Sequence, residues 1–406
     1  MIRWQCIVAL SLLAACAPPR GVAQVRPGIE VVLSDSAHLI AGKRLGLLTN
    51  HTGIDRQGRR DADVLLTARG ARLVVLFSPE HGFRGTEDRE GLPDSRDSAT
   101  GLPIYSLYGG SRSAARSALD SIDVLLIDLQ DIGARFYTYI ATATQLMRDA
   151  ARAGKRVIVL DRPDPIGGRE VQGNVRARLG SPDSELVGFL PVPMRHGMTL
   201  GELARMANDI MAIGDDLIVI PAAGWTRTMF YDETGLPWVK PSPNMPDLES
   251  ALSYPGLCLF EGTNLSVGRG TSVAFQVLGA PWLDPAKVID RLRASPVAGV
   301  EVTPTQFMPV APTDGKYAGV PLRGVQIRVR DRGRYDPTKL AVALLAALRA
   351  VHPDQFQFRA ASFDRLATGP ELRTALEAGR SPEEIWNGWE QDLARFRGTR
   401  EKYLIY

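Results

Sequence analysis

Short segments of continuous hydrophobicity recur along the first half of the chain and predict buried strands. They are apolar at successive positions rather than at alternate ones, which is typical of parallel strands that are covered on both faces. The segments are 44–50, 72–78, 123–129, 156–162 and 216–222. The pattern therefore predicts an open, mostly parallel sheet.

Helical periodicity fills the stretches between these strands. Residues 137–153 place apolar side chains on one face, and Gly154 follows at a position typical of a C-cap. Residues 198–213 repeat the pattern, with Thr199 as the predicted N-cap and Glu202 three residues later, at the spacing of a capping box. The alternation of strands and helices predicts an α/β fold with a Rossmann-like, mostly parallel sheet.

The chain changes character near residue 235. Residues 235–256 carry five prolines and little periodicity, so they predict a long ordered connection or the wall of a cleft. The patterns beyond it indicate a second, smaller α/β domain. They predict strands at 299–309 and 324–331 and helices at 336–351, 370–379 and 382–396. We expect a Rossmann-like domain at 24–250 and a smaller α/β domain at 251–406.

The N-terminus predicts an export signal at 1–23. Arg3 precedes an apolar run that is too short to span a bilayer as a mature helix. Two cleavage sites compete there. The sequence LAAC resembles a bacterial lipobox and would make Cys16 a lipidated membrane anchor, whereas cleavage after Ala23 would release a soluble protein. Either site predicts an exported protein, periplasmic or an outer-surface lipoprotein. Cys258 is the one cysteine beyond this leader, so we expect a buried thiol and no intrachain disulfide.

The composition and net charge bear on which kinds of molecule the protein binds. The chain has 406 residues, 45% of them apolar and 23% charged, which is typical of a soluble globular protein. A formal charge of +3 without a Lys/Arg block argues against a nucleic-acid partner.

Polar residues follow the predicted strands. Because ligands bind beyond the carboxyl ends of parallel strands, these residues predict one shared cleft. The candidates at this rim are Asn50, His51, Glu80, His81, Asp128, Asp131, Arg135, Tyr137 and Arg195.

Several kinds of site lack their sequence signatures. The chain has no GxxxxGK[ST], no GxGxxG after the first strand and no GxSxG. A metal site built from His51, His81, Asp128 and Asp131 lacks ligand spacing, and we expect no metal and no cofactor. Carboxylate chemistry remains, with Glu80, Asp128, Asp131 and Glu261 as candidates, and glycoside hydrolysis needs such groups.

Six motifs together resemble the exo-β-N-acetylmuramidases, over residues 28–406. They are TNHTG (49–53), SPEHGFRG (78–85), DLQDIGARFYTY (128–139), LDRPDPIGG (160–168), SPNMP (242–246) and FEGTNLSVGRGT (260–271). The resemblance implies release of N-acetylmuramic acid from the non-reducing ends of peptidoglycan fragments. It also implies a Rossmann-like catalytic domain packed on a smaller α/β domain, an active site in the cleft between them, and Glu80 as the catalytic acid/base.

These considerations assign expected roles. We predict Glu80, His81 and Asp128 as catalytic residues, with Asp128 or Asp131 polarising the acetamido group if the substrate assists. Arginines would bind the lactyl carboxylate and tyrosines would stack on a sugar ring. The predicted substrate contacts are Asn50, His51, Asp131, Arg135, Tyr137, Arg195, Asn244, Glu261, Asn264 and Arg269. A non-catalytic lipoprotein that binds muropeptides is the alternative, and a metal-dependent hydrolase is a third hypothesis.

Overall fold

The structure is a computed structural model and describes residues 24–85, 91–109, 111–214 and 216–406. The predicted leader, including Cys16 and both cleavage sites, lies outside the described residues. Within the described ranges, no helix is long and apolar enough to cross a membrane.

The first domain is built on a seven-stranded sheet with the strand order β3-β4-β2-β1-β5-β6-β9. The predicted strands are confirmed as β1, β2, β5, β6 and β9, and all neighbours are parallel except β3 and β4. With β3 set aside, the order is that of a Rossmann sheet, with its switch point between β1 and β5. The strands are β1 Arg44–Thr49, β2 Arg72–Ser78, β3 Ser95–Arg96, β4 Pro103–Ser106, β5 Val124–Asp128, β6 Arg156–Leu160 and β9 Leu217–Ile220.

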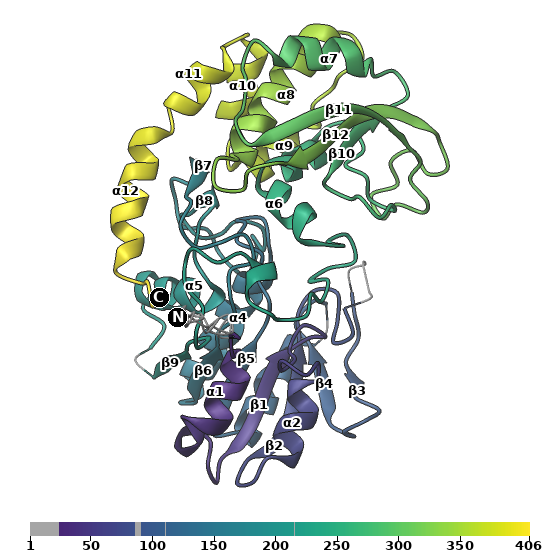
Figure 1. Cartoon of the computed structure of the whole chain (residues 1–406). Coiled ribbons are helices and arrows are strands. Elements are labelled where there is room, and N and C mark those ends of the chain that lie inside the picture. Colours follow the sequence, from purple (N-terminus) through teal and green to yellow (C-terminus); the bar gives the residue numbers. More distant parts are fainter. Residues whose placement is uncertain (1–23, 86–90, 110, 215) are drawn as a thin grey trace, which may run out of the picture.

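Helices cover both faces of this sheet (Figure 1). Leu48, Ile127 and Val159 belong to a core cluster with α4 and α5, whereas alternate residues such as Leu47 and Leu126 pack with α1 and α2. The predicted capping box at the start of α5 is confirmed. The helices are α1 Gly28–Ser34, α2 Asp61–Thr67, α3 Arg112–Ala118, α4 Tyr139–Arg152 and α5 Leu200–Ile210, with short 3-10 turns at Ala37–Leu39, Leu119–Ser121 and Tyr231–Glu233.

The proline-rich connection is more regular than its sequence predicts. Its second half forms α6 Leu248–Leu257, which begins with the Asp247 carboxylate accepting the Ser250 amide at 2.9 Å. Pro255 lies inside this helix, so the absence of periodicity concealed a buried helix rather than a loop. A 3-10 turn at Cys258–Gly262 continues it, and Cys258 is a free, buried thiol as predicted.

The second domain is a three-stranded antiparallel sheet, β10-β12-β11, packed against helices. The helix predicted at 382–396 is two helices, separated at Gly388 and Trp389. The elements are β10 Val277–Ala280, α7 Pro285–Leu292, β11 Val300–Phe307, β12 Leu322–Val329, α8 Pro337–Val351, α9 Ala360–Ala367, α10 Glu371–Glu377, α11 Pro382–Asn387 and α12 Glu390–Glu401. Between the domains lies the hairpin of β7 Gln172–Val175 and β8 Pro193–Arg195.

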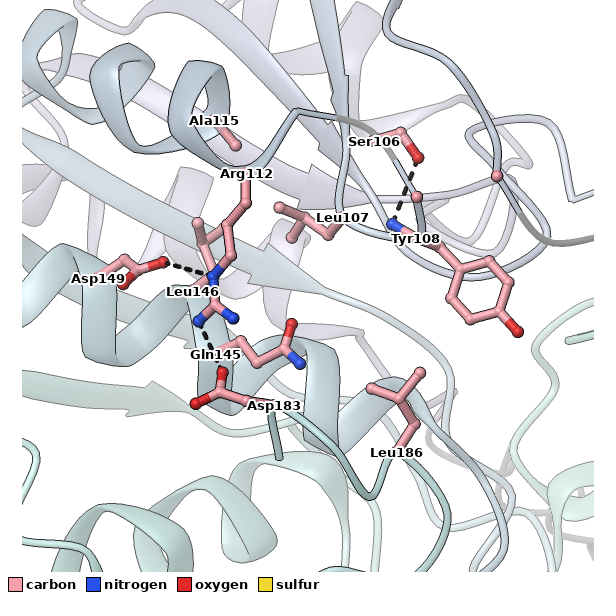
Figure 2. Close-up of a pocket in the computed structure, with 12 residues that line it drawn as sticks. Ser106, Leu107, Tyr108, Arg112, Ala115, Gln145, Leu146, Asp149, Asp183 and Leu186 are labelled. Carbon is pink, nitrogen blue, oxygen red and sulfur yellow. Dashed lines mark hydrogen bonds and ion pairs between the residues drawn. The ribbon is translucent and has the colours of Figure 1, made fainter. Parts of the chain in front are cut away.

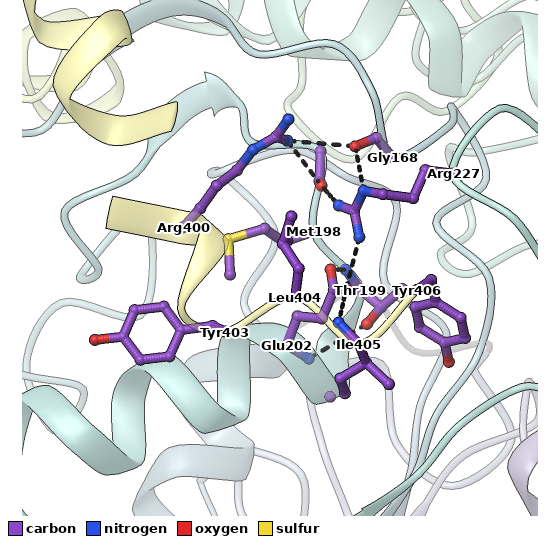
Figure 3. A network of polar contacts seen from close by, with 12 residues as sticks. Gly168, Met198, Thr199, Glu202, Arg227, Arg400, Tyr403, Leu404, Ile405 and Tyr406 are labelled. Carbon is purple, nitrogen blue, oxygen red and sulfur yellow. Dashed lines mark hydrogen bonds and ion pairs between the residues drawn. The ribbon is translucent and has the colours of Figure 1, made fainter. Parts of the chain in front are cut away.

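The chain ends against the first domain. Helix α12 runs back from the second domain, and the residues after it lie beside α5 (Figures 1 and 3). The Ile405 amide donates to Glu202 Oε1 at 2.9 Å, and the Tyr406 hydroxyl donates to Asp161 Oδ2 at 2.8 Å. Arg227 pairs with the same Glu202 at 2.6 Å. One continuous hydrophobic core also runs through both domains, so they form a single packed unit.

Candidate active site

Glu80 lies in the turn that follows β2, at the edge of a cleft between the two domains. Its side chain is partly buried. Thr138, at the N-cap position of α4, donates its hydroxyl to Glu80 Oε2, and it is the one described residue that hydrogen-bonds this side chain. The cleft has a volume of about 940 Å³ and is lined by Glu80, Tyr108, Thr138, Arg176, Ala177, Arg178, Ser184, Glu185, Leu186, Val187, Asp364, Arg365, Thr368 and Glu371. We call it the Glu80 cleft.

The turn itself is tightly constrained. His81 has a φ of 67°, a left-handed conformation that is uncommon for a residue other than glycine. The Gly82 amide donates to the Pro79 carbonyl at 3.1 Å. A side chain at Gly85 would place its Cβ 1.8 Å from the His51 ring. His81 itself lines a separate hollow of about 310 Å³, so the structure does not bring it into the Glu80 cleft.

Two arginines of the cleft have no ion-pair partner among the described residues. Arg178 follows β7, and Arg365 is on α9 of the second domain; both are exposed. Arg176, by contrast, is paired with Glu185 and donates from Nε to the Arg178 carbonyl at 2.6 Å. The two domains thus each contribute one available guanidinium to the cleft, and neither was among the predicted arginines.

The carboxylates that line the cleft also divide into ion-paired and unpaired groups. Glu185 is neutralised by Arg176, and Asp364 accepts hydrogen bonds from Nε and one terminal nitrogen of Arg373, each at 2.8 Å. Across the described ranges, Glu80 and the exposed Glu371 are the lining carboxylates without an ion pair. Glu371 was not predicted from the sequence.

Asp128 occupies a different environment from Glu80. It is fully buried and pairs with Arg162, whose NH2 nitrogen lies 3.0 Å from Oδ2. Asp61, also fully buried, lies 3.6 Å from the same guanidinium. Burial and the neighbouring Asp128 carboxylate raise the pKa of Asp61 well above its ordinary value, and the two carboxylates raise the pKa of Arg162 despite its burial. This buried charge cluster of Asp61, Asp128 and Arg162 does not line the cleft.

Asp131 is buried beside His196. Its Oδ1 accepts the Gly133 amide at 2.8 Å, and the His196 ring lies 3.8 Å away. Burial raises the pKa of Asp131 to about 7 and lowers the pKa of His196 to about 3, so His196 is neutral. In the described part of the chain, no three His, Cys, Asp or Glu side chains gather as a metal site would require.

The predicted arginines Arg135 and Arg195 are buried and donate hydrogen bonds to other parts of the protein. Arg135 donates to the carbonyls of Asn174 at 2.6 Å and Leu366 at 3.1 Å, which joins the hairpin to α9. Arg195 donates to Gln172 at 3.1 Å. Burial lowers the pKa of both arginines, that of Arg135 to about 9. Their guanidinium groups bind the protein's own backbone and side chains rather than facing the cleft.

The remaining predicted residues of the first domain make contacts within the protein and do not line the Glu80 cleft. Asn50 donates to the Tyr139 hydroxyl at 2.9 Å and accepts the Thr52 amide at 2.9 Å. His51 contacts the Lys240 carbonyl at 2.6 Å, and burial lowers its pKa. Tyr137 is buried with its ring 4.9 Å from that of Tyr139, and Asn244 is 9% exposed.

The glycine-rich segment of the second domain, residues 260–271, makes its polar and packing contacts within that domain. Glu261 pairs with Arg269, and Asn264 donates to the Gln355 carbonyl at 2.7 Å. A Cβ at Gly262 would lie 2.5 Å from the Phe363 backbone, so this glycine permits contact with α9. None of these residues lines the Glu80 cleft.

Comparisons with known proteins agree over most of the chain. Family models described as exo-β-N-acetylmuramidase NamZ match residues 45–249 for the N-terminal part and 252–406 for the C-terminal part. The peptidoglycan β-N-acetylmuramidase NamZ of Bacillus subtilis (strain 168) is 39% identical over 385 residues, which cover 94% of this chain and 92% of the relative.

Two solved structures have the same fold. Both are DUF1343 family proteins from Bacteroides fragilis NCTC 9343. One gives a TM-score of 0.85 at 34% identity and covers 94% of this chain and 99% of that protein. The other gives 0.76 at 32% identity and covers 95% and 99%.

Proposed function

Because this chain belongs to the exo-β-N-acetylmuramidase family NamZ, we propose that it releases N-acetylmuramic acid from the non-reducing ends of peptidoglycan fragments, with Glu80 as the acid/base. One observation carries the assignment of Glu80. Among the described carboxylates, Glu80 is the one that lines the cleft, is partly buried and has no ion-pair partner.

The contacts of Glu80 suit proton transfer. Thr138 holds one carboxyl oxygen and so fixes the orientation of the other. In glycoside hydrolysis the acid protonates the glycosidic oxygen, the bond from that oxygen to C1 breaks, and water supplies the hydroxyl that C1 gains. The shortened glycan then leaves with a free hydroxyl. Glu371 or the substrate's own acetamido oxygen is available to assist the attack at C1.

The available arginines suit the substrate's charge. N-acetylmuramic acid differs from N-acetylglucosamine by a lactyl group that bears a carboxylate. Arg178 and Arg365 are the cleft guanidinium groups that no described carboxylate neutralises, so we assign them to this carboxylate. A guanidinium from each domain would make binding depend on both domains.

The test uses residues 24–406 with a chromogenic β-N-acetylmuramide and the matching β-N-acetylglucosaminide, with and without a chelator. We expect hydrolysis of the muramide alone, unchanged by the chelator.

We expect Arg365→Gln to lower kcat/KM on the muramide about 10- to 100-fold, as for a lost charge-assisted hydrogen bond. Arg291→Gln on α7 is the matched control, because Arg291 is exposed and does not line the cleft. Binding of muramic acid without turnover would favour the binding lipoprotein, and loss of activity to the chelator a metal-dependent hydrolase.

We further propose that the protein is exported and anchored through a lipid on Cys16. The motif LAAC at 13–16 and the apolar run before it support this proposal. In a bacterial host, Cys16→Ala is expected to move the protein from the membrane fraction to the soluble fraction. An unchanged distribution would instead favour cleavage after Ala23 or retention by another signal.

A further inference from the structure

A second pocket adjoins the Glu80 cleft and shares two of its wall residues. This pocket, which we call the Arg112 pocket, has a volume of about 450 Å³. Tyr108 and Leu186 line both cavities, so the two cavities adjoin at these side chains. Figure 2 shows them across from the cluster around Arg112.

The charges of the Arg112 pocket are satisfied within the protein. Arg112 lies 2.6 Å from Asp183 and 3.7 Å from Asp149, as the dashed lines in Figure 2 show. Behind them, Arg148 pairs with Asp183 at 2.7 Å and Arg116 with Asp149 at 3.0 Å. Among the described residues that line the pocket, each arginine and aspartate has an opposite charge beside it, so these residues offer little to a carboxylate or an amine.

The uncharged part of the lining suits a neutral polar ligand. Gln145 supplies an amide whose nitrogen donates to the Pro182 carbonyl, which holds the side chain in place. Leu107 and Leu146 add apolar side chains to the lining, and Tyr108 adds an aromatic one. Apolar walls with a few fixed polar groups are typical of small-molecule sites of this size.

We propose that the Arg112 pocket binds the sugar on the leaving-group side of the scissile bond, an uncharged N-acetylhexosamine. This inference rests on the proposed function. In a peptidoglycan chain the unit released by an exo-acting enzyme is joined to N-acetylglucosamine, which carries no charge. The two cavities match this asymmetry. The cleft with available arginines takes the anionic muramic acid, and the adjoining pocket with paired charges takes its neutral neighbour.

The alternative occupant is the stem peptide on the lactyl group. Such peptides carry carboxylates and an amine, whereas the lining of the Arg112 pocket contains one arginine and two aspartates, all paired. A peptide would therefore leave its charges desolvated without partners. The pocket favours the sugar.

The test compares a chromogenic muramide, whose leaving group is a small phenol, with the disaccharide of N-acetylmuramic acid β-linked to N-acetylglucosamine. Leu107→Trp fills the pocket, and Gln145→Leu removes its amide at similar volume. Neither residue lines the Glu80 cleft. We expect each variant to lower kcat/KM for the disaccharide tenfold or more and to keep that for the muramide within twofold. Free N-acetylglucosamine should inhibit wild-type muramide hydrolysis and inhibit Leu107→Trp less.

Other outcomes overturn the proposal. Equal losses on both substrates would mean that the pocket supports the fold or the cleft, and unchanged disaccharide kinetics in both variants would exclude a sugar site. Loss confined to a peptide-bearing substrate would assign the pocket to the stem peptide. Failure of the wild type to hydrolyse the muramide would instead refute the proposed function, so the two failures are distinguishable.

Discussion

Two groups of polar residues lie beyond the carboxyl ends of the same sheet and have opposite surroundings. The buried charge cluster of Asp61, Asp128 and Arg162 follows β5 and its neighbours, and its members are 3% exposed or less. Glu80 follows β2, is partly exposed and faces the cleft. Strand position does not separate the two groups, because β2 and β5 flank the central strand β1 on opposite sides. Asp128 is the last residue of β5 and lies within the buried sheet, whereas Glu80 lies two residues beyond the end of β2, in a turn at the cleft. A polar strand end therefore marks either a structural charge or a reactive one, and burial decides which.

The largest effect on stability should come from the buried cluster. Arg162→Met leaves Asp61 and Asp128 facing each other without a cation, and we expect it to lower the free energy of unfolding by about 3–5 kcal/mol. Denaturant unfolding followed by circular dichroism measures this. Arg178→Met is the control from the cleft, and we expect less than about 0.5 kcal/mol because Arg178 is exposed and unpaired. Equal losses in the two variants would remove the distinction between the groups.

The pH dependence of stability sharpens the comparison at Asp131. Its pKa in the folded protein is about 7, above its ordinary value, because it is buried. The folded protein therefore binds this proton more tightly than the unfolded chain does. Protonated Asp131 therefore contributes to the free energy of unfolding. This contribution is complete below about pH 4 and is lost as the pH rises through 7, by at most about 1.4 kcal/mol per pH unit.

Asp131→Asn removes this titration and keeps an oxygen for the Gly133 amide. We expect the variant to gain stability relative to wild type by about 2 kcal/mol more at pH 8 than at pH 5. Urea unfolding at the two pH values measures the difference. Asp183→Asn, at a partly exposed and ion-paired position whose pKa is lowered, is expected to show no such gain.

The smallest effect concerns the end of the chain. Tyr406→Phe removes one hydroxyl that donates to Asp161 and accepts the Ala222 amide, and we expect a loss of about 1 kcal/mol in stability with little change in kcat. Thermal unfolding and muramide kinetics check the two parts. A large loss of kcat without a loss of stability would show that the C-terminal residues 403–406 (Figure 3) influence the active site rather than only hold the chain end against the first domain.

The sequence predicts most of the fold because the strand signal is strong. The five buried strands are continuously apolar, and the capping box of α5 is a local signal that needs no tertiary context. The missed elements have weak signals for physical reasons. β3 and β4 are short, and α6 is buried on all sides and contains Pro255, so it has no polar face to produce a helical period.

The candidate site is less predictable because a residue's type does not reveal its partner. Arg135 lies in the motif DLQDIGARFYTY but donates to backbone carbonyls, as Arg195 does, whereas Arg178 and Arg365 belong to no motif and line the cleft. Arg365 reaches the cleft only because α9 of the second domain packs there. Thr138 is within the motif DLQDIGARFYTY, yet its pairing with Glu80 depends on how α4 meets the turn after β2.

The most direct test of the central claim measures single-turnover and steady-state kinetics of Glu80→Gln on the chromogenic muramide, together with binding of N-acetylmuramic acid and the free energy of unfolding. Glu401→Gln on α12, at an exposed position that does not line the cleft, is the control. We expect Glu80→Gln to lower kcat about 10²- to 10⁴-fold, as for loss of a general acid. Binding should persist, and stability should change by less than about 1 kcal/mol. Wild-type turnover in a folded Glu80→Gln protein would contradict the assignment of Glu80.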